Sequence, residues 1–248
     1  MDYIYGLRAV IEAIREGRQI DKLLIKKDLS GELSSELFAM LKEHRIFVQR
    51  VPVEKLNRIT RKNHQGVIAL LSAVEYHDLG NTIATLYEDG ILPFIVVLDG
   101  ITDVRNFGAI ARTAECCGVN ALVIAERGSV SVGADAVKTS AGALMSLPVC
   151  RERNISIAVK MLKDSGFNIV AVSEKANRNY TLGDYTVPTA LILGAEDTGI
   201  SREVLNLCDS HVSIPMFGHI GSLNVSVAAG VLMYEVVRQR LNSNLEVI

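Results

Sequence analysis

This chain of 248 residues lacks the cysteine patterns of zinc sites and disulfide scaffolds. Its four cysteines, at 116, 117, 150 and 208, form no C-x-x-C pair, and no histidine stands at metal-ligand spacing from them. These features predict no metal site. They favour small, buried, apolar thiols in a reducing compartment.

Signals for export and membrane insertion are lacking as well. The first residues, MDYIYGLRAVIEAI, contain no basic region followed by an apolar core, which a signal peptide requires. The longest apolar stretch, residues 225–237, is interrupted by Ser226, Gly230 and Glu235 and is too short to cross a bilayer. We therefore expect a cytoplasmic protein with no membrane partner.

The chain has little net charge, with 26 Lys and Arg against 28 Asp and Glu. Residues 1–76 hold 13 of the basic and 10 of the acidic residues, so the acidic excess lies in residues 77–248. A mildly basic first segment is compatible with binding to phosphates. It also fits an ordinary solvated surface, and charge alone does not identify a nucleic-acid partner.

Periodicity predicts a small α/β domain over residues 1–76, a linker with a short helix over 77–92 and a larger α/β domain over 93–248. In the first domain we expect helices at 7–15, 32–44 and 53–59, and strands at 22–26, 47–51 and 66–71. In the second we expect strands at 94–98, 121–125, 168–172, 189–193 and 212–214, and helices near 108–117, 155–165, 201–207 and 223–241. Apolar runs such as FIVVL suit strands buried on both faces, so the alternation predicts a parallel, doubly wound sheet.

Polar residues gather where three of these strands end. The first segment, NFGAIARTAECCG, places Asn106 at a helix start and Arg112 inside the helix. Catalytic groups in open α/β sheets collect at the carboxyl ends of strands. The plainer interpretation is that Asn106 caps the helix and Arg112 is an exposed cation.

The other two segments have the same form. LILGAEDTGIS places Gly194 at a strand end, where a ligand can approach the backbone, and Glu196 in the following turn. SIPMFGHIGSLNVS places Ser222, Leu223 and Asn224 at the start of the last helix, where polar groups bind anions or simply cap the helix.

Together, in this order, the three segments resemble the signature motifs of the SpoU-type (TrmH family) RNA 2′-O-methyltransferases of the knotted SPOUT superfamily. The resemblance implies a C-terminal trefoil knot, a homodimer formed through the C-terminal domain, and S-adenosylmethionine as cofactor. It assigns catalysis to Arg112, Asn106, Glu196, Ser222 and Asn224. It assigns cofactor contacts to Gly194, Ile214, Met216 and Leu223. Asp197 departs from the commonest motif, which has Gly after the Glu.

The front of the chain extends the resemblance. YGLRAVIEAI at 5–14 and NHQGVIAL at 63–70 are similar to the substrate-binding domain of the branch that modifies guanosine in 23S rRNA, a domain that resembles RNA-binding ribosomal proteins. The implied reaction is methyl transfer to a guanosine ribose 2′-hydroxyl of large-subunit rRNA. A tRNA substrate and a non-catalytic RNA-binding assembly factor are the alternatives. A dehydrogenase is disfavoured because no G-x-G-x-x-G follows a strand.

The resemblance assigns activation of the hydroxyl to Arg112, and two roles are compatible with this. A guanidinium is hard to deprotonate, so a basic Arg112 would need help from a neighbouring group or a phosphate. A cationic Arg112 would instead stabilise the developing alkoxide.

Overall fold

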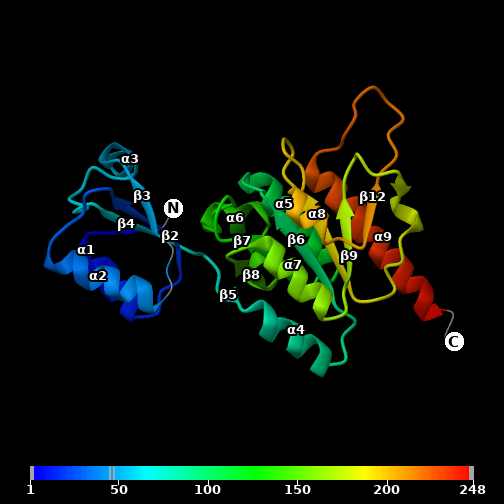
Figure 1. The fold of residues 1–248 in the computed structure, drawn as a ribbon, viewed down its shortest axis with the longest axis horizontal. Coiled ribbons are helices and arrows are strands. Elements are labelled where there is room, and N and C mark those ends of the chain that lie inside the picture. Colours follow the sequence, from blue (N-terminus) through cyan, green and yellow to red (C-terminus); the bar gives the residue numbers. More distant parts are fainter. Residues whose placement is uncertain (1–2, 45, 47, 246–248) are drawn as a thin grey trace. The chain divides into compact units, whose positions relative to one another are not determined.

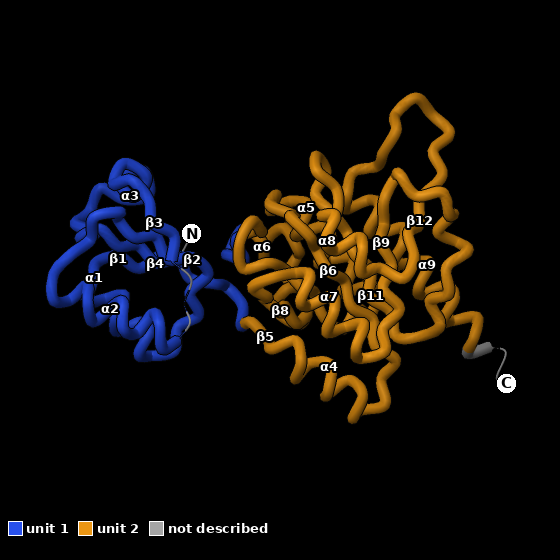
Figure 2. Tube along the Cα trace, in the orientation of Figure 1, with its two compact units in different colours: residues 1–75, 131–135 blue, residues 76–130, 136–248 orange. Residues whose placement is uncertain are grey.

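The computed structural model describes residues 3–44, 46 and 48–245 (Figure 1). The chain divides into two compact units, coloured separately in Figure 2. Unit 1 comprises residues 1–75 and 131–135, and unit 2 comprises residues 76–130 and 136–248. Each unit has its own hydrophobic core.

Unit 1 is a four-stranded sheet, in the order β1-β4-β2-β3, with three helices. Its elements are β1 (Tyr3–Tyr5), α1 (Leu7–Arg15), β2 (Ile20–Lys26), α2 (Glu32–Glu43), β3 (Val48–Val51), α3 (Val53–Ile59) and β4 (Val67–Leu71). The apolar stripe of α1, with Val10, Ile11 and Ile14, is buried against β2 and β4. The predicted helices and strands of this segment are present, although Phe47 lies outside the described residues.

Residues 131–135 join unit 1 although they lie far along the chain. The buried carboxylate of Asp21 accepts hydrogen bonds from the Ser131 hydroxyl and from the Val132 N–H, the latter at 3.3 Å. The Val132 carbonyl in turn accepts the Ala73 N–H at 2.9 Å. A buried carboxylate needs such donors, and sequence periodicity cannot show that a segment 110 residues away supplies them.

Unit 2 is built on an eight-stranded sheet, in the order β10-β12-β9-β11-β6-β7-β8-β5, whose neighbours all pair in parallel. Its strands are β5 (Tyr76–His77), β6 (Phe94–Asp99), β7 (Ala121–Ala125), β8 (Val149–Glu152), β9 (Asn168–Val172), β10 (Arg178–Asn179), β11 (Thr189–Gly194) and β12 (Ser210–Ser213). Its helices are α4 (Leu79–Glu88), α5 (Val104–Cys116), α7 (Ile155–Asp164), α8 (Arg202–Leu205) and α9 (Val225–Leu245), with 3-10 turns at Ala143–Met145 and Tyr180–Leu182. α6 (Ala134–Thr139) begins in unit 1 and ends in unit 2. The parallel α/β architecture expected from the sequence is confirmed, whereas the trefoil knot stays a prediction.

The linker predicted at 77–92 is corrected by the structure. Asp78 caps α4 by accepting the Asn81 N–H at 2.8 Å, and Leu79, Ile83 and Leu86 are buried. Leu79 and Ile83 pack in the same core as the central strands of unit 2. The segment therefore belongs to unit 2. Its ten-residue helix was underestimated because glycine and asparagine at its start obscure the periodicity.

Membrane insertion is not indicated by any helix in the described part of the chain, because none combines sufficient length with an apolar composition.

Arg240 of α9 binds backbone carbonyls from two other segments of unit 2. Arg240 donates to the carbonyls of Leu92, Pro93, Tyr185 and Val187 at 2.9–3.1 Å. Burial lowers the pKa of Arg240, and these four carbonyl acceptors satisfy its guanidinium.

The cysteines are all free thiols, but they are not all buried as the sequence suggested. Cys116 is exposed at the end of α5. Burial raises the pKa of Cys150 to about 11 and of Cys208 to about 12, and burial together with the neighbouring Cys116 raises the pKa of Cys117 to about 11. The thiolate is the reactive form, so these three should be inert at neutral pH.

We therefore expect one thiol of the four to react rapidly with a disulfide reagent such as Ellman's reagent at pH 8. The reacting group should be Cys116, and Cys116→Ser should remove the fast phase. In denaturant all four thiols should react, and this total is the reference for the number that react in the native protein. Rapid reaction of three or four thiols in the native protein would contradict the described burial.

Candidate active site

The carboxyl ends of β6 and β11 position the first two segments singled out in the sequence. These strands are neighbours, with Gly194 of β11 in register with Asp99 of β6. The chain leaves β6 towards Asn106 and leaves β11 towards Glu196, so both side chains reach the same edge of the sheet. The third segment approaches this edge from β12 through the loop that precedes α9.

Three polar side chains from the three segments meet there and hydrogen-bond to one another; we call them the polar triad, Asn106, Glu196 and Asn224. The Asn106 amide nitrogen donates to Glu196 Oε1 at 3.1 Å, and the Asn224 amide nitrogen donates to Asn106 Oδ1 at 3.0 Å. Asn224 also donates to Glu196 Oε1. Residues 90 and 118 positions apart in sequence are thus in direct contact.

Backbone N–H groups fix the orientation of the triad. Asn224 precedes α9 and accepts the Ser226 N–H on Oδ1 at 2.9 Å, so its amide nitrogen must face the other two side chains. The Val225 N–H adds a contact to Glu196 Oε1 at 3.4 Å. Asn224 therefore acts as helix cap and triad member at once.

Asn106 is not the helix cap that the plainer interpretation proposed. Asp103 caps α5, accepting the N–H groups of Arg105 and Asn106 at 2.8 and 2.9 Å. Because α5 begins at Val104 rather than near residue 108, Asn106 lies inside the first turn. Its side chain is consequently released for the triad.

A cavity of about 370 Å³ opens beside the triad. The four residues predicted to contact a cofactor all line it, together with three of the five predicted catalytic residues: Gly194, Ile214, Met216, Leu223, Glu196, Ser222 and Asn224. Its size is in the range of small-molecule sites. Its lining combines apolar side chains such as Ile214, Met216 and Leu223 with the carboxylates of Glu174 and Glu196, a set that suits a ligand with a flat ring and a positive charge.

A second, smaller cavity of about 230 Å³ adjoins the first. Asn106 and Asp103 line it, and Glu196 and Val225 line both cavities. The triad therefore lies at the boundary between two spaces that can hold different groups.

Arg112 and Ser222 are not part of the hydrogen-bonded triad. Arg112 is exposed on α5 and, among the described residues, makes no hydrogen bond or ion pair to the triad. Six residues along a helix correspond to about 240° around its axis, so Arg112 and Asn106 lie on different faces. Ser222 is exposed, lines the larger cavity and precedes the cap residue.

Sequence reasoning missed two polar residues at this edge. Glu174, which follows β9, lines the larger cavity and brings a second carboxylate to it. Asp99, at the end of β6, accepts the Ser201 N–H at 2.8 Å and so holds the start of α8. Both follow a correctly predicted strand, so the rule that flagged Glu196 would have found them.

Both parts of the chain match families of RNA methyltransferase domains. Residues 93–234 match the SpoU rRNA Methylase family, and residues 3–77 match the RNA 2′-O ribose methyltransferase substrate-binding family. A protein of Staphylococcus saprophyticus, assigned to the TrmH family of tRNA/rRNA methyltransferases, is 37% identical over 96% of this chain and 95% of its own length.

Solved structures give the same result. The SpoU methyltransferase AviRb from Streptomyces viridochromogenes, determined in complex with the cofactor AdoMet, is 28% identical, with a TM-score of 0.60, and the match covers 97% of this chain and 90% of AviRb. The A. aeolicus TrmH/SpoU tRNA modifying enzyme is 31% identical, with a TM-score of 0.56, over 67% of this chain and 86% of its own. The chain therefore belongs to the SpoU family of RNA methyltransferases, whose cofactor is S-adenosylmethionine.

Proposed function

We propose that this protein transfers a methyl group from S-adenosylmethionine to the ribose 2′-hydroxyl of a guanosine in large-subunit rRNA, in the cytoplasm. The observation that carries the proposal is the meeting of three distant segments in one polar triad beside a cavity lined by all four expected cofactor residues. A binding protein without catalysis has no need to keep this set together.

The larger cavity fits the cofactor by its chemistry. Ile214, Met216 and Leu223 offer apolar surface for a purine ring. Glu174 and Glu196 also line the cavity and would supply negative charge to a cationic sulfonium bound there. When bound, the cofactor supplies a methyl group on a good leaving group, so the protein must mainly orient the hydroxyl and ease the loss of its proton.

The triad and Arg112 divide that work in our proposal. Glu196, pinned by two amides and by the Val225 N–H, holds a fixed position between the two cavities. Asn106 and Asn224 orient it and, with Ser222, position the target ribose. Arg112 stays cationic and stabilises the alkoxide that forms as the hydroxyl loses its proton.

The choice of rRNA rests on the front of the chain. Unit 1 matches a substrate-binding family, whereas the tRNA modifying enzyme of A. aeolicus matches only 67% of this chain. A tRNA substrate is the second candidate, because curated relatives are assigned to both RNA classes.

Isotopically labelled S-adenosylmethionine offered with unmodified large-subunit rRNA and, separately, with unmodified tRNA tests the choice. We expect labelled 2′-O-methylguanosine in the digest of the rRNA alone. Label in tRNA would keep the reaction and overturn the substrate. Label in neither RNA, naked or in an assembling ribosomal particle, would contradict the proposed function.

We also propose a homodimer through α9. The three small residues Ala228, Ala229 and Gly230 of α9 would let another helix approach closely, but Gly230 already faces Thr113 of α5 in the same chain. A separate stripe of Val227, Tyr234 and Leu241, spaced by seven residues and 51–59% exposed, leaves apolar surface on one face of the helix.

We therefore expect Tyr234→Arg to convert a dimer into a monomer in light scattering at micromolar concentration. Ile157→Arg, at an exposed isoleucine on α7, is the matched control and should remain dimeric. A monomeric wild-type protein, or a dimeric Tyr234→Arg variant, would contradict this interface.

A further inference from the structure

Unit 1 contains an open cavity of about 510 Å³ that is distinct from the two cavities of the active site. The β2–α2 loop, α3 and the α3–β4 loop supply most of its lining residues, and all three belong to unit 1. Its polar lining residues are Lys26, Asp28, Ser30, Asn57, Lys62, Asn63, His64 and Gln65.

The buried His64 fixes the orientation of one lining amide. The Gly66 N–H, which can only donate, donates to His64 Nδ1 at 3.0 Å, so the proton of a neutral His64 ring lies on Nε2. His64 Nε2 is 2.9 Å from the side chain of Asn57, and the Asn57 atom that accepts its proton must be Oδ1. The Asn57 amino group is thereby left for the cavity that Asn57 lines.

Gln65 is fixed in the same way. The Leu7 N–H donates to Gln65 Oε1 at 3.0 Å, so the Gln65 amino group is the part left for a ligand. Gln65 holds a left-handed backbone with φ of 50°, which is uncommon for a residue other than glycine. Such a conformation persists only where its surroundings enforce it, and it is often found at ligand sites.

Two lysine ammonium groups add positively charged hydrogen-bond donors to the amino groups of Asn57 and Gln65. Lys26 and Lys62 line the cavity with a single carboxylate, Asp28. The Lys62 Nζ atom lies 5.8 Å from the centre of the Tyr5 ring, a cation–π contact that holds the ammonium near the cavity. Two amino groups and two ammonium groups call for a ligand rich in acceptors and negatively charged.

We propose that this cavity binds one unpaired nucleotide of the RNA substrate. Asn57 and Gln65 donate to the carbonyl groups of its base, and Lys62 contacts a phosphate. Unpaired nucleotides present their base edges to proteins, whereas in an A-form duplex the deep, narrow major groove hides them. The inference rests on the proposed function, because it assigns the captured polymer as RNA.

The fixed amides also predict which bases are accepted. Asn and Gln read adenine by using their oxygen and nitrogen together, on N6 and N7. In this cavity each of the two oxygens already accepts one hydrogen bond, which fixes its direction and disfavours that pairing. Uracil, guanine and cytosine carry a carbonyl oxygen and adenine does not, so a carbonyl-bearing base is preferred.

Fluorescence anisotropy of the full-length protein with 12-residue oligouridine and oligoadenosine tests the proposal. Wild type should bind oligouridine about five- to tenfold more tightly. Asn57→Asp keeps the acceptor for His64 but removes the amino group, and it should weaken oligouridine binding about tenfold and erase the preference. Lys62→Gln should weaken binding to both probes by a similar factor.

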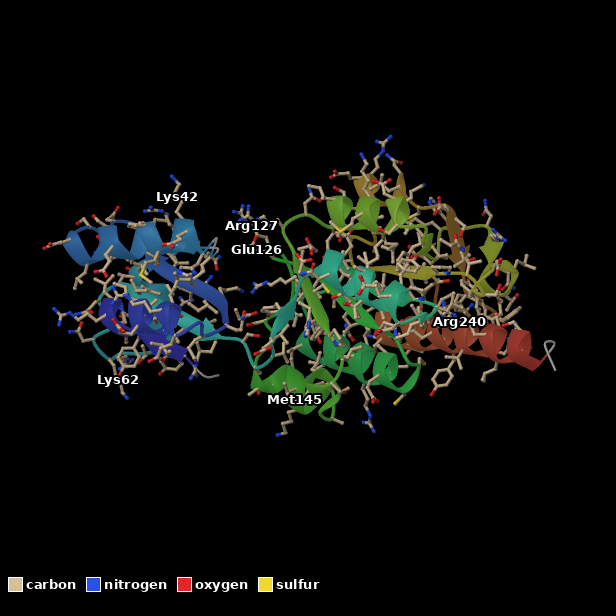
Figure 3. All side chains as sticks on the ribbon, turned by 90° about the horizontal axis from the view of Figure 1, so that it is seen from below. Lys42, Lys62, Glu126, Arg127, Met145 and Arg240 are labelled. Atoms are coloured by element: carbon tan, nitrogen blue, oxygen red, sulfur yellow. The ribbon has the colours of Figure 1, made fainter. Side chains whose placement is uncertain are left out.

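Lys42→Gln is the matched control, because it also lowers the charge by one and Lys42 lies at the opposite edge of unit 1 from Lys62 (Figure 3). It should bind within twofold of wild type, and melting curves should show all variants folded. Equal binding of wild type and Asn57→Asp, or of both probes by wild type, would overturn the inference. Methyl transfer to rRNA distinguishes this inference from the proposed function. If the wild type methylates rRNA and Asn57→Asp has the same KM for rRNA, the nucleotide site is wrong and the proposed function stands.

Discussion

Replacement of Arg112 by alanine should abolish methyl transfer, with kcat lowered by about 10²–10³-fold or more, the loss seen when a charge-stabilising donor is removed from an active site. Binding of S-adenosylmethionine should stay within about twofold of wild type. The structure separates the two effects, because Arg112 is exposed on α5 and does not line the cofactor-sized cavity. Single-turnover transfer to rRNA and calorimetric titration of the cofactor measure them independently.

Two controls sharpen the Arg112 result. Arg153→Ala removes another exposed guanidinium of unit 2, one that lies 3.8 Å from Glu126, and should leave kcat unchanged. A pH–rate profile of the wild type distinguishes the two roles, since a cationic Arg112 contributes no ionisation in the accessible range. Wild-type turnover by Arg112→Ala would remove this residue from the mechanism.

Replacement of Gly194 by alanine should have the largest effect on cofactor binding. A Cβ atom at residue 194 would lie 2.2 Å from the carbonyl carbon of Gly199 and 2.2 Å from the nitrogen of Ile200. Both neighbours are backbone atoms, so no side-chain rotation relieves the clash, and the 195–200 loop must move. That loop lines the cavity and carries Glu196.

We expect Gly194→Ala to weaken S-adenosylmethionine binding at least tenfold and to destabilise the protein by several kcal/mol, as overpacking against rigid neighbours does. Gly133→Ala is the matched control, because a Cβ there meets nothing within 4 Å and its φ is not positive. Calorimetric titration and thermal melting give both quantities. Wild-type affinity in Gly194→Ala would mean that the ligand binds elsewhere.

Local patterns were enough to locate most of the fold. The runs at 121–125 and 168–172 became β7 and β9 without change, because strands buried on both faces are continuously apolar. The helix at 155–165 was found because its stripe of Ile155, Val159 and Leu162 repeats with helical spacing. β8 was missed because VCRE is short and its two apolar residues are followed by two charged ones, so no strand periodicity is visible.

The three residues of the polar triad could be singled out from the sequence, but the hydrogen bonds between them could not. Asn106, Glu196 and Asn224 were each identified, yet each had an equally good local role in a helix start or an acidic turn. The register that places β11 beside β6 brings Asn106 and Glu196 together, and the loop between β12 and α9 returns Asn224 to them. Likewise, no local pattern shows that residues 131–135 satisfy Asp21 or that Gly230 packs on α5.

The position of the transferred methyl group tests the central claim most directly. Alkaline cleavage of RNA uses the 2′-hydroxyl as its internal nucleophile, so a methylated ribose protects the adjoining phosphodiester bond. After reaction with labelled S-adenosylmethionine and complete alkaline hydrolysis of the RNA, the label should remain in an alkali-resistant dinucleotide, and no label should enter RNA treated with Arg112→Ala. Label recovered in mononucleotides would place the methyl group on a base and contradict the assignment of the polar triad and Arg112 to a ribose hydroxyl.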